Sequence, residues 1–257
     1  MGRILITGST DGFGLETARQ LVDRKHEVYL HARSQVRAEE VKAKCPGAAG
    51  VLVADLTSEE ETRKLADEAN AIGTFDAVIL NAGLMSGPFR KTPTGVPAQV
   101  SVNLVAPYML TCLLKQPKRL IFIASVLHHQ SQNTDIQDIF WLKRGEQEWN
   151  DFQAYCDSKF HIVLLANAAA RRFKDTSVTS VHPGWVPTKL AGEGAPDKLE
   201  DGVETYVMLA EGDYDTSLTG AYFNPKRERG QAHSLTSDEN LQEAVVNACE
   251  ELTSLKL

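Results

Sequence analysis

Short apolar runs alternate with longer segments of helical periodicity along most of this chain, and this alternation limits its fold more than any other feature. Apolar runs predict strands at 4–7, 28–31, 51–54, 77–80, 120–124 and 178–181, with a short last one at Tyr222 and Phe223. Helical segments lie at 15–24, 36–44, 59–72, 99–114, 154–172 and 199–210. Because crossovers between parallel strands are right-handed, the pattern predicts an α/β fold, with a doubly wound parallel sheet and helices on both faces.

The domain organisation follows from the same pattern. A chain of 257 residues is long enough to bury a large core as one α/β domain. No internal repeat or low-complexity linker divides it, so residues 1–257 are expected to form a single domain. Segments at about 127–151 and 189–204 are interpreted as insertions. Because loops that follow parallel strands bind ligands in such sheets, both are expected near the substrate site.

Charge and cysteine content exclude several classes of function. The net charge of −7 provides no basic field for nucleic acid or anionic lipid. The four cysteines are scattered, with no C-x-x-C pair, which predicts reduced thiols and no metal site. No apolar run has the length of a signal peptide or a membrane span. We therefore expect a cytoplasmic protein without a nucleic-acid partner.

A glycine-rich turn follows the first predicted strand and opens the first predicted helix. Its spacing is Gly8-x-x-x-Gly12-x-Gly14, with Ser9 and Phe13 among the residues between. Glycine lets the backbone turn sharply and approach a pyrophosphate closely, and a helix N-terminus offers free N–H groups to an anion. A tight turn without a ligand can have the same composition. The position at the first strand–helix junction favours a dinucleotide-binding turn.

The end of the second predicted strand bears on which dinucleotide is bound. NAD sites carry an acidic residue near this point for the ribose 2′-hydroxyl, whereas an arginine accommodates the 2′-phosphate of NADP. This strand ends without an acid and is followed by Arg33. The sequence therefore favours NADP(H), with Arg33 and Ser9 as phosphate partners, and NAD(H) is the alternative. Arg33 could otherwise be an ordinary solvated charge.

An ordered set of motifs extends from about residue 3 to about residue 224. Tyr155 and Lys159 form a Y-x-x-x-K pair at the start of a predicted helix, which carries little information by itself. The motifs that accompany the pair are the glycine turn, Asp55, Asn81-Ala82-Gly83, Asn103, Ser125, Pro183-Gly184 and Thr188. Together they resemble the short-chain dehydrogenase/reductase family, and the resemblance implies a Rossmann fold.

Finer features resemble the branch that contains retinol dehydrogenases, WW-domain oxidoreductases and daunorubicin-type C-13 ketoreductases. Residues 124–128 resemble its S-S-x-x-H motif, and Trp149 and residues 183–188 add to the likeness. The chain departs from the family at Phe13, where isoleucine is usual, and in the length of the 127–151 insertion. Because that insertion precedes a helix on which family members often dimerise, either a monomer or a dimer is expected.

The resemblance implies an NAD(P)(H)-dependent oxidoreductase that reduces a ketone or aldehyde to an alcohol, or catalyses the reverse reaction. Tyr155 would be the general acid or base. Lys159 lies one helical turn further on, and its ammonium would lower the pKa of the phenol. By the resemblance, Lys159 also holds the nicotinamide ribose and Ser125 hydrogen-bonds the substrate oxygen. Asn103 would hold a kinked helix and a proton-relay water.

The resemblance also assigns cofactor contacts. Those on the adenosine side are Asp55 and Leu56, which would meet the adenine, and Asn81, Ala82 and Gly83, which would pack on the ribose. Those on the nicotinamide side are Pro183, Gly184, Val186 and Thr188, of which Val186 and Thr188 would bind the carboxamide.

Two other interpretations stay open. The chain could be a dinucleotide-binding regulator or scaffold without turnover, although it keeps Tyr155 and Lys159, which such family members often lose. A sugar-nucleotide epimerase is a poorer fit, because those chains are generally longer. His128 and His129 lie in the insertion and are interpreted as loop or pocket-rim residues rather than catalysts.

Overall fold

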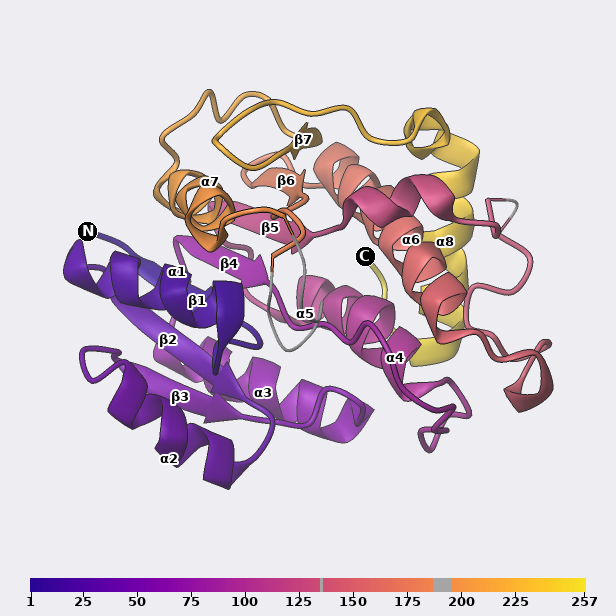
Figure 1. Cartoon of the computed structure of the whole chain (residues 1–257), viewed down its shortest axis with the longest axis horizontal. Coiled ribbons are helices and arrows are strands. Elements are labelled where there is room, and N and C mark those ends of the chain that lie inside the picture. Colours follow the sequence, from indigo (N-terminus) through magenta and orange to yellow (C-terminus); the bar gives the residue numbers. More distant parts are fainter. Residues whose placement is uncertain (135, 187–195) are drawn as a thin grey trace.

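The computed structural model describes residues 1–134, 136–186 and 196–257, which form a seven-stranded parallel sheet between two layers of helices (Figure 1). The strand order is β3-β2-β1-β4-β5-β6-β7, and every neighbouring pair is parallel. The strands are β1 (Arg3–Ile6), β2 (Glu27–Ala32), β3 (Gly50–Val53), β4 (Ala77–Leu80), β5 (Arg119–Ile123), β6 (Ser177–Val181) and β7 (Ala221–Phe223). The order reverses between β1 and β4, where doubly wound sheets bind ligands. The predicted fold class is confirmed.

The helices divide between the two faces of the sheet. One face carries α1 (Gly12–Asp23), α2 (Gln35–Lys44) and α7 (Leu199–Glu211). The other carries α3 (Glu59–Ile72), α5 (Ala106–Leu113), α6 (Asp151–Arg172) and α8 (Glu239–Thr253). Side chains alternate along a strand, so Leu5 of β1 packs in one layer while Ile4 and Ile6 pack in the other. Strands buried on both faces explain why the apolar runs are continuous.

Local capping sets where several helices begin. The Ser58 side chain accepts a hydrogen bond from the backbone N–H of Glu61, and three glutamates occupy the first turn of α3. An acceptor side chain and negative charge both stabilise a helix N-terminus. The helix ends at Gly73, whose φ is +128°. These signals explain why α3 has the bounds that its periodicity predicts.

The segment 99–114 departs from the predicted single helix. It consists of α4 (Ala98–Val100), a π-helical turn η1 (Ser101–Val105) and α5. The turn is centred on Asn103, whose side chain is hydrogen-bonded to Leu84 and Ser158, residues outside this helical segment. A π-turn inside a helix is often found at a functional site.

Helix α8, which no sequence motif predicts, packs against α6.

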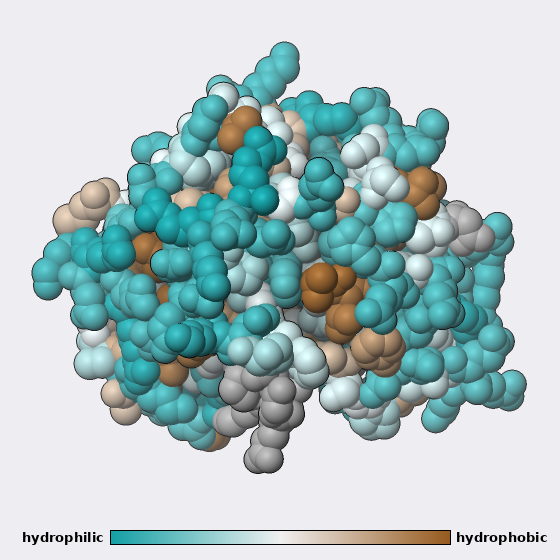
Figure 2. Space-filling model, turned by 45° about the horizontal axis from the view of Figure 1, so that its top comes forward, coloured by the Kyte–Doolittle hydropathy of each residue, from teal (hydrophilic) through white to brown (hydrophobic). Residues whose placement is uncertain are grey.

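Among residues 1–134, 136–186 and 196–257, few large apolar side chains are exposed, and the face in Figure 2 is mostly hydrophilic with a few small apolar patches. Within the described residues, no helix is long and apolar enough to cross a membrane. The same residues contain no group of three or more potential metal ligands.

Candidate active site

The glycine turn between β1 and α1 is as tight as its sequence predicts. Gly8 and Gly12 have φ values of +62° and +55°, a region that other residues rarely adopt. A Cβ at Gly8 would lie 2.7 Å from the Ala82 Cα, and one at Gly14 would lie 2.7 Å from the Gly8 oxygen. Asn81, after β4, donates to the Gly8 carbonyl at 3.0 Å. The turn and the end of β4 therefore form one unit.

The His31 side chain connects the glycine turn to the residue after β3, a role that sequence analysis did not assign. Its Nδ1 accepts from the Gly8 N–H at 2.9 Å, and its Nε2 lies 2.9 Å from the Ala54 carbonyl oxygen. Because a carbonyl only accepts, Nε2 carries the proton of a neutral ring. Burial lowers the pKa of His31 to about 4, which keeps it neutral. A histidine at the end of an apolar strand was the available signal.

The Ser9 side chain does not face the cavity beside the glycine turn, although the sequence analysis predicts that it binds a phosphate. Its side chain is fully buried, donating to the Ile6 carbonyl at 2.9 Å and accepting from the His31 N–H at 2.9 Å. The hydroxyl therefore holds the glycine turn against β2 and does not line the cavity beside it. This corrects the expectation that Ser9 contacts a 2′-phosphate.

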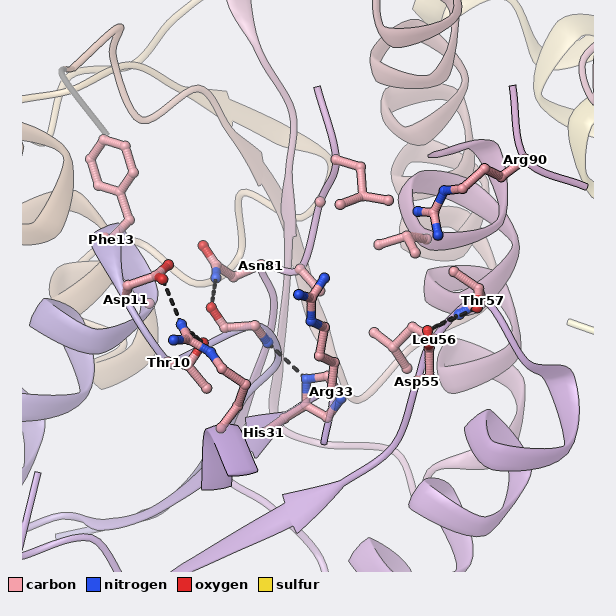
Figure 3. Close-up of a pocket in the computed structure, with 18 residues that line it drawn as sticks. Thr10, Asp11, Phe13, His31, Arg33, Asp55, Leu56, Thr57, Asn81 and Arg90 are labelled. Atoms are coloured by element: carbon pink, nitrogen blue, oxygen red, sulfur yellow. Dashed lines mark hydrogen bonds and ion pairs between the residues drawn. The ribbon is translucent and has the colours of Figure 1, made fainter. Parts of the chain in front are cut away.

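A first cavity of about 490 Å³ runs from the glycine turn across the ends of β2, β3 and β4 (Figure 3). It brings together these residues of the sequence analysis: Gly8, Gly12, Phe13, Gly14, Arg33, Asp55, Leu56, Asn81, Ala82 and Gly83. It also includes residues that the motifs did not indicate: Thr10, Asp11, His31, Arg37, Thr57, Leu84, Arg90 and Val102. Its length along three strand ends and its glycine turn suit a dinucleotide.

The charged side chains of the first cavity differ in how they are paired. Arg37 binds the Asp11 carboxylate at 2.7 Å and the Thr10 hydroxyl at 3.1 Å. Asp55 accepts from the backbone and hydroxyl of Thr57, both at 2.9 Å. Arg33 is exposed, and its guanidinium has no hydrogen-bond or ion-pair partner among the described residues. An arginine in this state can meet an anion without first losing a partner.

A second cavity, of about 290 Å³, adjoins the first. Phe13, Asn81 and Gly83 line both. The other residues around it are mostly apolar and include Met85, Leu127, Phe152, Trp185 and Tyr206, with Ser125, Tyr155, Lys159 and His182 as the main polar ones. A ligand bound in the first cavity could therefore extend into a largely apolar space beside these polar groups.

Ser125, Tyr155 and Lys159 meet on the wall of the second cavity. Ser125 follows β5 and caps the short helix η2 (Val126–Gln130), where it accepts from the Leu127 N–H at 3.2 Å. Its side chain also interacts with that of Tyr155 on α6, which lowers the pKa of the phenol. Lys159 Nζ lies 5.6 Å from the centre of the Tyr155 ring and donates to the Ile123 carbonyl at 2.7 Å.

The pKa of Tyr155 differs in direction from the expectation. Burial raises the pKa of Tyr155 to about 12, although the interaction with Ser125 opposes the rise. Burial also lowers the pKa of Lys159 to about 8. Removing water disfavours the charged forms of both side chains, and the groups that further influence Tyr155 are Ser125 and Cys156. Tyr155 is therefore a protonated phenol at neutral pH, as a proton donor must be.

Asn103 lies behind these groups and does not line either cavity. Its Oδ1 accepts from the Leu84 N–H at 2.8 Å. Its Nδ2 donates to the Leu84 carbonyl at 2.8 Å and to the Ser158 hydroxyl at 3.0 Å. Asn103 thus joins the loop after β4 to α6 between Tyr155 and Lys159, and these bonds account for the interrupted helix.

The remaining predicted residues divide between the second cavity and the segments around it. Pro183, Gly184 and Val186 line the cavity, and Thr188 lies outside the described residues, as does 189–195 of the second insertion. His128 is fully buried rather than on a pocket rim. Its Nδ1 donates to the Ser125 carbonyl at 2.6 Å, and its Nε2 accepts from the His233 N–H at 2.9 Å. It therefore holds the Ser125 backbone.

Comparison with known sequences identifies a family. The family model described as short chain dehydrogenase matches residues 3–135. The short-chain dehydrogenase chry4 of Gibberella zeae is 75% identical over 257 residues, which cover 100% of this chain and 99% of that protein. Human retinol dehydrogenase 11 is 33% identical over 205 residues, covering 73% of this chain and 62% of that protein.

Solved structures share the fold at lower identity. A protein of Mycobacterium paratuberculosis superposes with a TM-score of 0.82 at 22% identity, covering 100% of this chain and 94% of that one. Salutaridine reductase from Papaver somniferum gives a TM-score of 0.70 at 18% identity, covering 87% of this chain and 99% of that one.

Proposed function

The chain belongs to the short-chain dehydrogenase/reductase family, oxidoreductases that act on CH–OH or C=O groups with NAD(P)(H), and we propose that it uses NADPH to reduce a ketone or aldehyde to an alcohol, or catalyses the reverse. One observation carries the proposal. A buried, protonated Tyr155 lines, together with Ser125, an apolar cavity that adjoins the elongated cavity at the glycine turn. We also propose one catalytic domain over 1–257, because the sheet and helices draw on residues from Arg3 to Thr253.

The residues of the first cavity fit the proposed cofactor. A Cβ at Gly8 or Gly14 would collide with atoms of Ala82 or of the turn itself, so glycine at these positions permits the tight turn that would present the N–H groups at the start of α1 to a pyrophosphate. Arg33, without a partner among the described residues, suits a 2′-phosphate. Lys159, which lines the second cavity beside Gly83, would hold the nicotinamide ribose. When bound, NADPH supplies the hydride.

The polar groups of the second cavity have distinct proposed roles. Ser125 would hydrogen-bond the substrate carbonyl oxygen, where negative charge develops. Tyr155 would transfer its phenolic proton to that oxygen, so that C=O becomes CH–OH once the carbon has received a hydride. Lys159 would favour the phenolate that remains. In alcohol oxidation the same proton returns to Tyr155.

The apolar walls indicate the class of substrate. Val126, Phe152 and Trp185 are among the few large apolar side chains that are exposed within the described residues, and all three line the second cavity. Apolar surface held open to solvent at a cavity favours an apolar ligand. We therefore propose a carbonyl compound with a sizeable apolar or aromatic body.

The proposal is tested by following NADPH consumption with a panel of apolar ketones and aldehydes. Wild-type protein should turn over members of the panel, and Ser125→Ala should lower kcat by about 100-fold while leaving the Kd for NADPH unchanged. In a parallel titration, Arg33→Ala should weaken NADPH more than NADH. NADPH binding without turnover of any carbonyl compound would instead favour the regulator interpretation.

A further inference from the structure

The loop after β4 brings a second arginine to the adenosine end of the first cavity. Arg90 lines this cavity together with Leu56, Thr57 and Val102. Arg90 is exposed, and its guanidinium has no hydrogen-bond or ion-pair partner among the described residues. In Figure 3, Arg33 and Arg90 reach into this part of the cavity from different elements. Only Arg33 stands where the family resemblance indicates a cofactor-selecting charge.

The backbone that carries Arg90 is held in place. The Arg90 carbonyl accepts from the Ala98 N–H at 2.8 Å. On the other side, Trp149 of the first insertion donates through Nε1 to the Gly87 carbonyl at 3.0 Å and packs edge-on against Phe89, with ring centroids 5.2 Å apart. The insertion therefore supports the loop while the Arg90 side chain is left facing the cavity.

The charges around the cavity favour a doubly charged anion at this end. The Arg37 charge is met by Asp11 and Glu40. Asp55, the other acid among the lining residues, is hydrogen-bonded to Thr57 and forms no ion pair with Arg33 or Arg90. Arg33 and Arg90 thus leave two positive charges without a paired acid in a protein whose net charge is −7. A phosphate monoester carries about −1.5 to −2 near pH 7, whereas the ribose hydroxyl of NAD is neutral.

We propose that Arg90 is the second cation that binds the 2′-phosphate of NADP(H), across the cavity from Arg33. The inference rests on the proposed function, because it specifies which cofactor the same site selects. Two guanidinium groups on separate elements can each form charge-assisted hydrogen bonds to one phosphate. The selectivity for NADPH then depends on both arginines, and removal of Arg33 alone leaves part of it.

Two cofactor fragments that differ by one phosphate test the assignment. Calorimetry would measure 2′,5′-ADP and 5′-AMP binding to wild type, Arg90→Ala, Arg33→Ala and the double variant. Arg90→Ala should weaken 2′,5′-ADP by about tenfold and 5′-AMP by less than about twofold. Arg229→Ala removes an exposed arginine that lines neither cavity, and should change neither affinity.

The outcomes separate this inference from the function on which it rests. If wild type prefers 2′,5′-ADP but Arg90→Ala leaves that preference intact, Arg90 is not a phosphate ligand and the NADPH assignment stands. An equal loss for both fragments would mean that Arg90 contacts adenine, which also overturns the inference. If wild type binds both fragments equally, the NADPH preference itself fails.

Discussion

Lys159 and Tyr155 lie one helical turn apart on α6, yet among the described residues the Lys159 ammonium donates to the Ile123 carbonyl, at 2.7 Å, and not to the phenol. This bond ties the first half of α6 to the end of β5, two residues before Ser125. Both side chains are buried, Tyr155 at 6% exposure and Lys159 at 4%. The lysine thereby keeps a fixed position beside the phenol ring while its other N–H groups remain to bind a ligand.

The affinity for NADPH should depend on pH through Lys159. Burial lowers the pKa of Lys159 to about 8, so its ammonium is charged below that pH and neutral above it. Since the charged form is the better donor to ribose hydroxyls, the affinity should fall as pH rises through about 8. Fluorescence titrations across this range should show the inflection in wild type and lose it in Lys159→Met. An unchanged affinity across the range in wild type would contradict the assigned role.

Replacement of Asn103 should affect stability and turnover together. Asn103→Ala leaves the Leu84 N–H and carbonyl without their partner, at a cost of at most about 1–3 kcal/mol for each of these partly buried groups. Urea denaturation should report this loss, and kcat should fall because α6 loses its connection to the loop after β4. Asn240→Ala, at an exposed asparagine, is the control. A stable but inactive Asn103→Ala would point to direct chemistry instead.

Substitution of two glycines with nearly the same φ can distinguish the cost of backbone strain from the cost of a steric clash. Gly8 and Gly145 have φ values of +62° and +61°, but a Cβ at Gly145 would meet nothing within 4 Å. Gly145→Ala should lose about 1–2 kcal/mol of stability and keep NADPH affinity. Gly8→Ala should lose more stability, because its Cβ would lie 2.7 Å from the Ala82 Cα, and it should bind NADPH at least about tenfold more weakly. Equal effects would refute a special role for Gly8.

Acid should destabilise the fold through buried histidines. Burial lowers the pKa of His31 to about 4, against about 6.5 in an unfolded chain. Between these values the unfolded state binds a proton that the folded state does not. The stabilisation is therefore complete above pH 6.5 and declines as pH falls toward 4, by about 1.4 kcal/mol per pH unit. Denaturation of His31→Gln across this window should give a shallower slope than wild type. An identical slope would mean that His31 does not titrate in this way.

The sequence predicts best what depends on neighbouring residues. The bounds of α3 follow from Ser58, the glutamates and Gly73, all close in the chain. The interruption at Asn103 depends on Leu84 and Ser158, which are 19 and 55 residues away in sequence, so local periodicity could only extend the helix. The buried position of Ser9 likewise depends on β2, 22 residues further along the chain.

The same contrast between features set by neighbouring residues and features set by distant ones applies to the candidate site. The motifs indicate the glycine turn, Ser125, Pro183 and Gly184, because those positions follow strand ends that the alternation already places on one edge. Tyr155 and Lys159 are indicated by their spacing on a helix and by the resemblance. The motifs do not indicate His31, Arg37 or Arg90, whose roles depend on which atoms face the first cavity. They also lead to the wrong direction for the pKa of Tyr155, because the extent of burial around a phenol cannot be read from the spacing of two residues on a helix.

The central claim is that the Tyr155 hydroxyl delivers the proton, and Tyr155→Phe tests it most directly because the change removes one oxygen atom. Wild type and variant should be compared in two measurements, the Kd for NADPH and kcat with a ketone that the wild type reduces. The account predicts an NADPH affinity within about twofold of wild type and a fall in kcat of about 1,000-fold or more. A Tyr155→Phe enzyme that binds NADPH and retains a substantial part of wild-type kcat would contradict it.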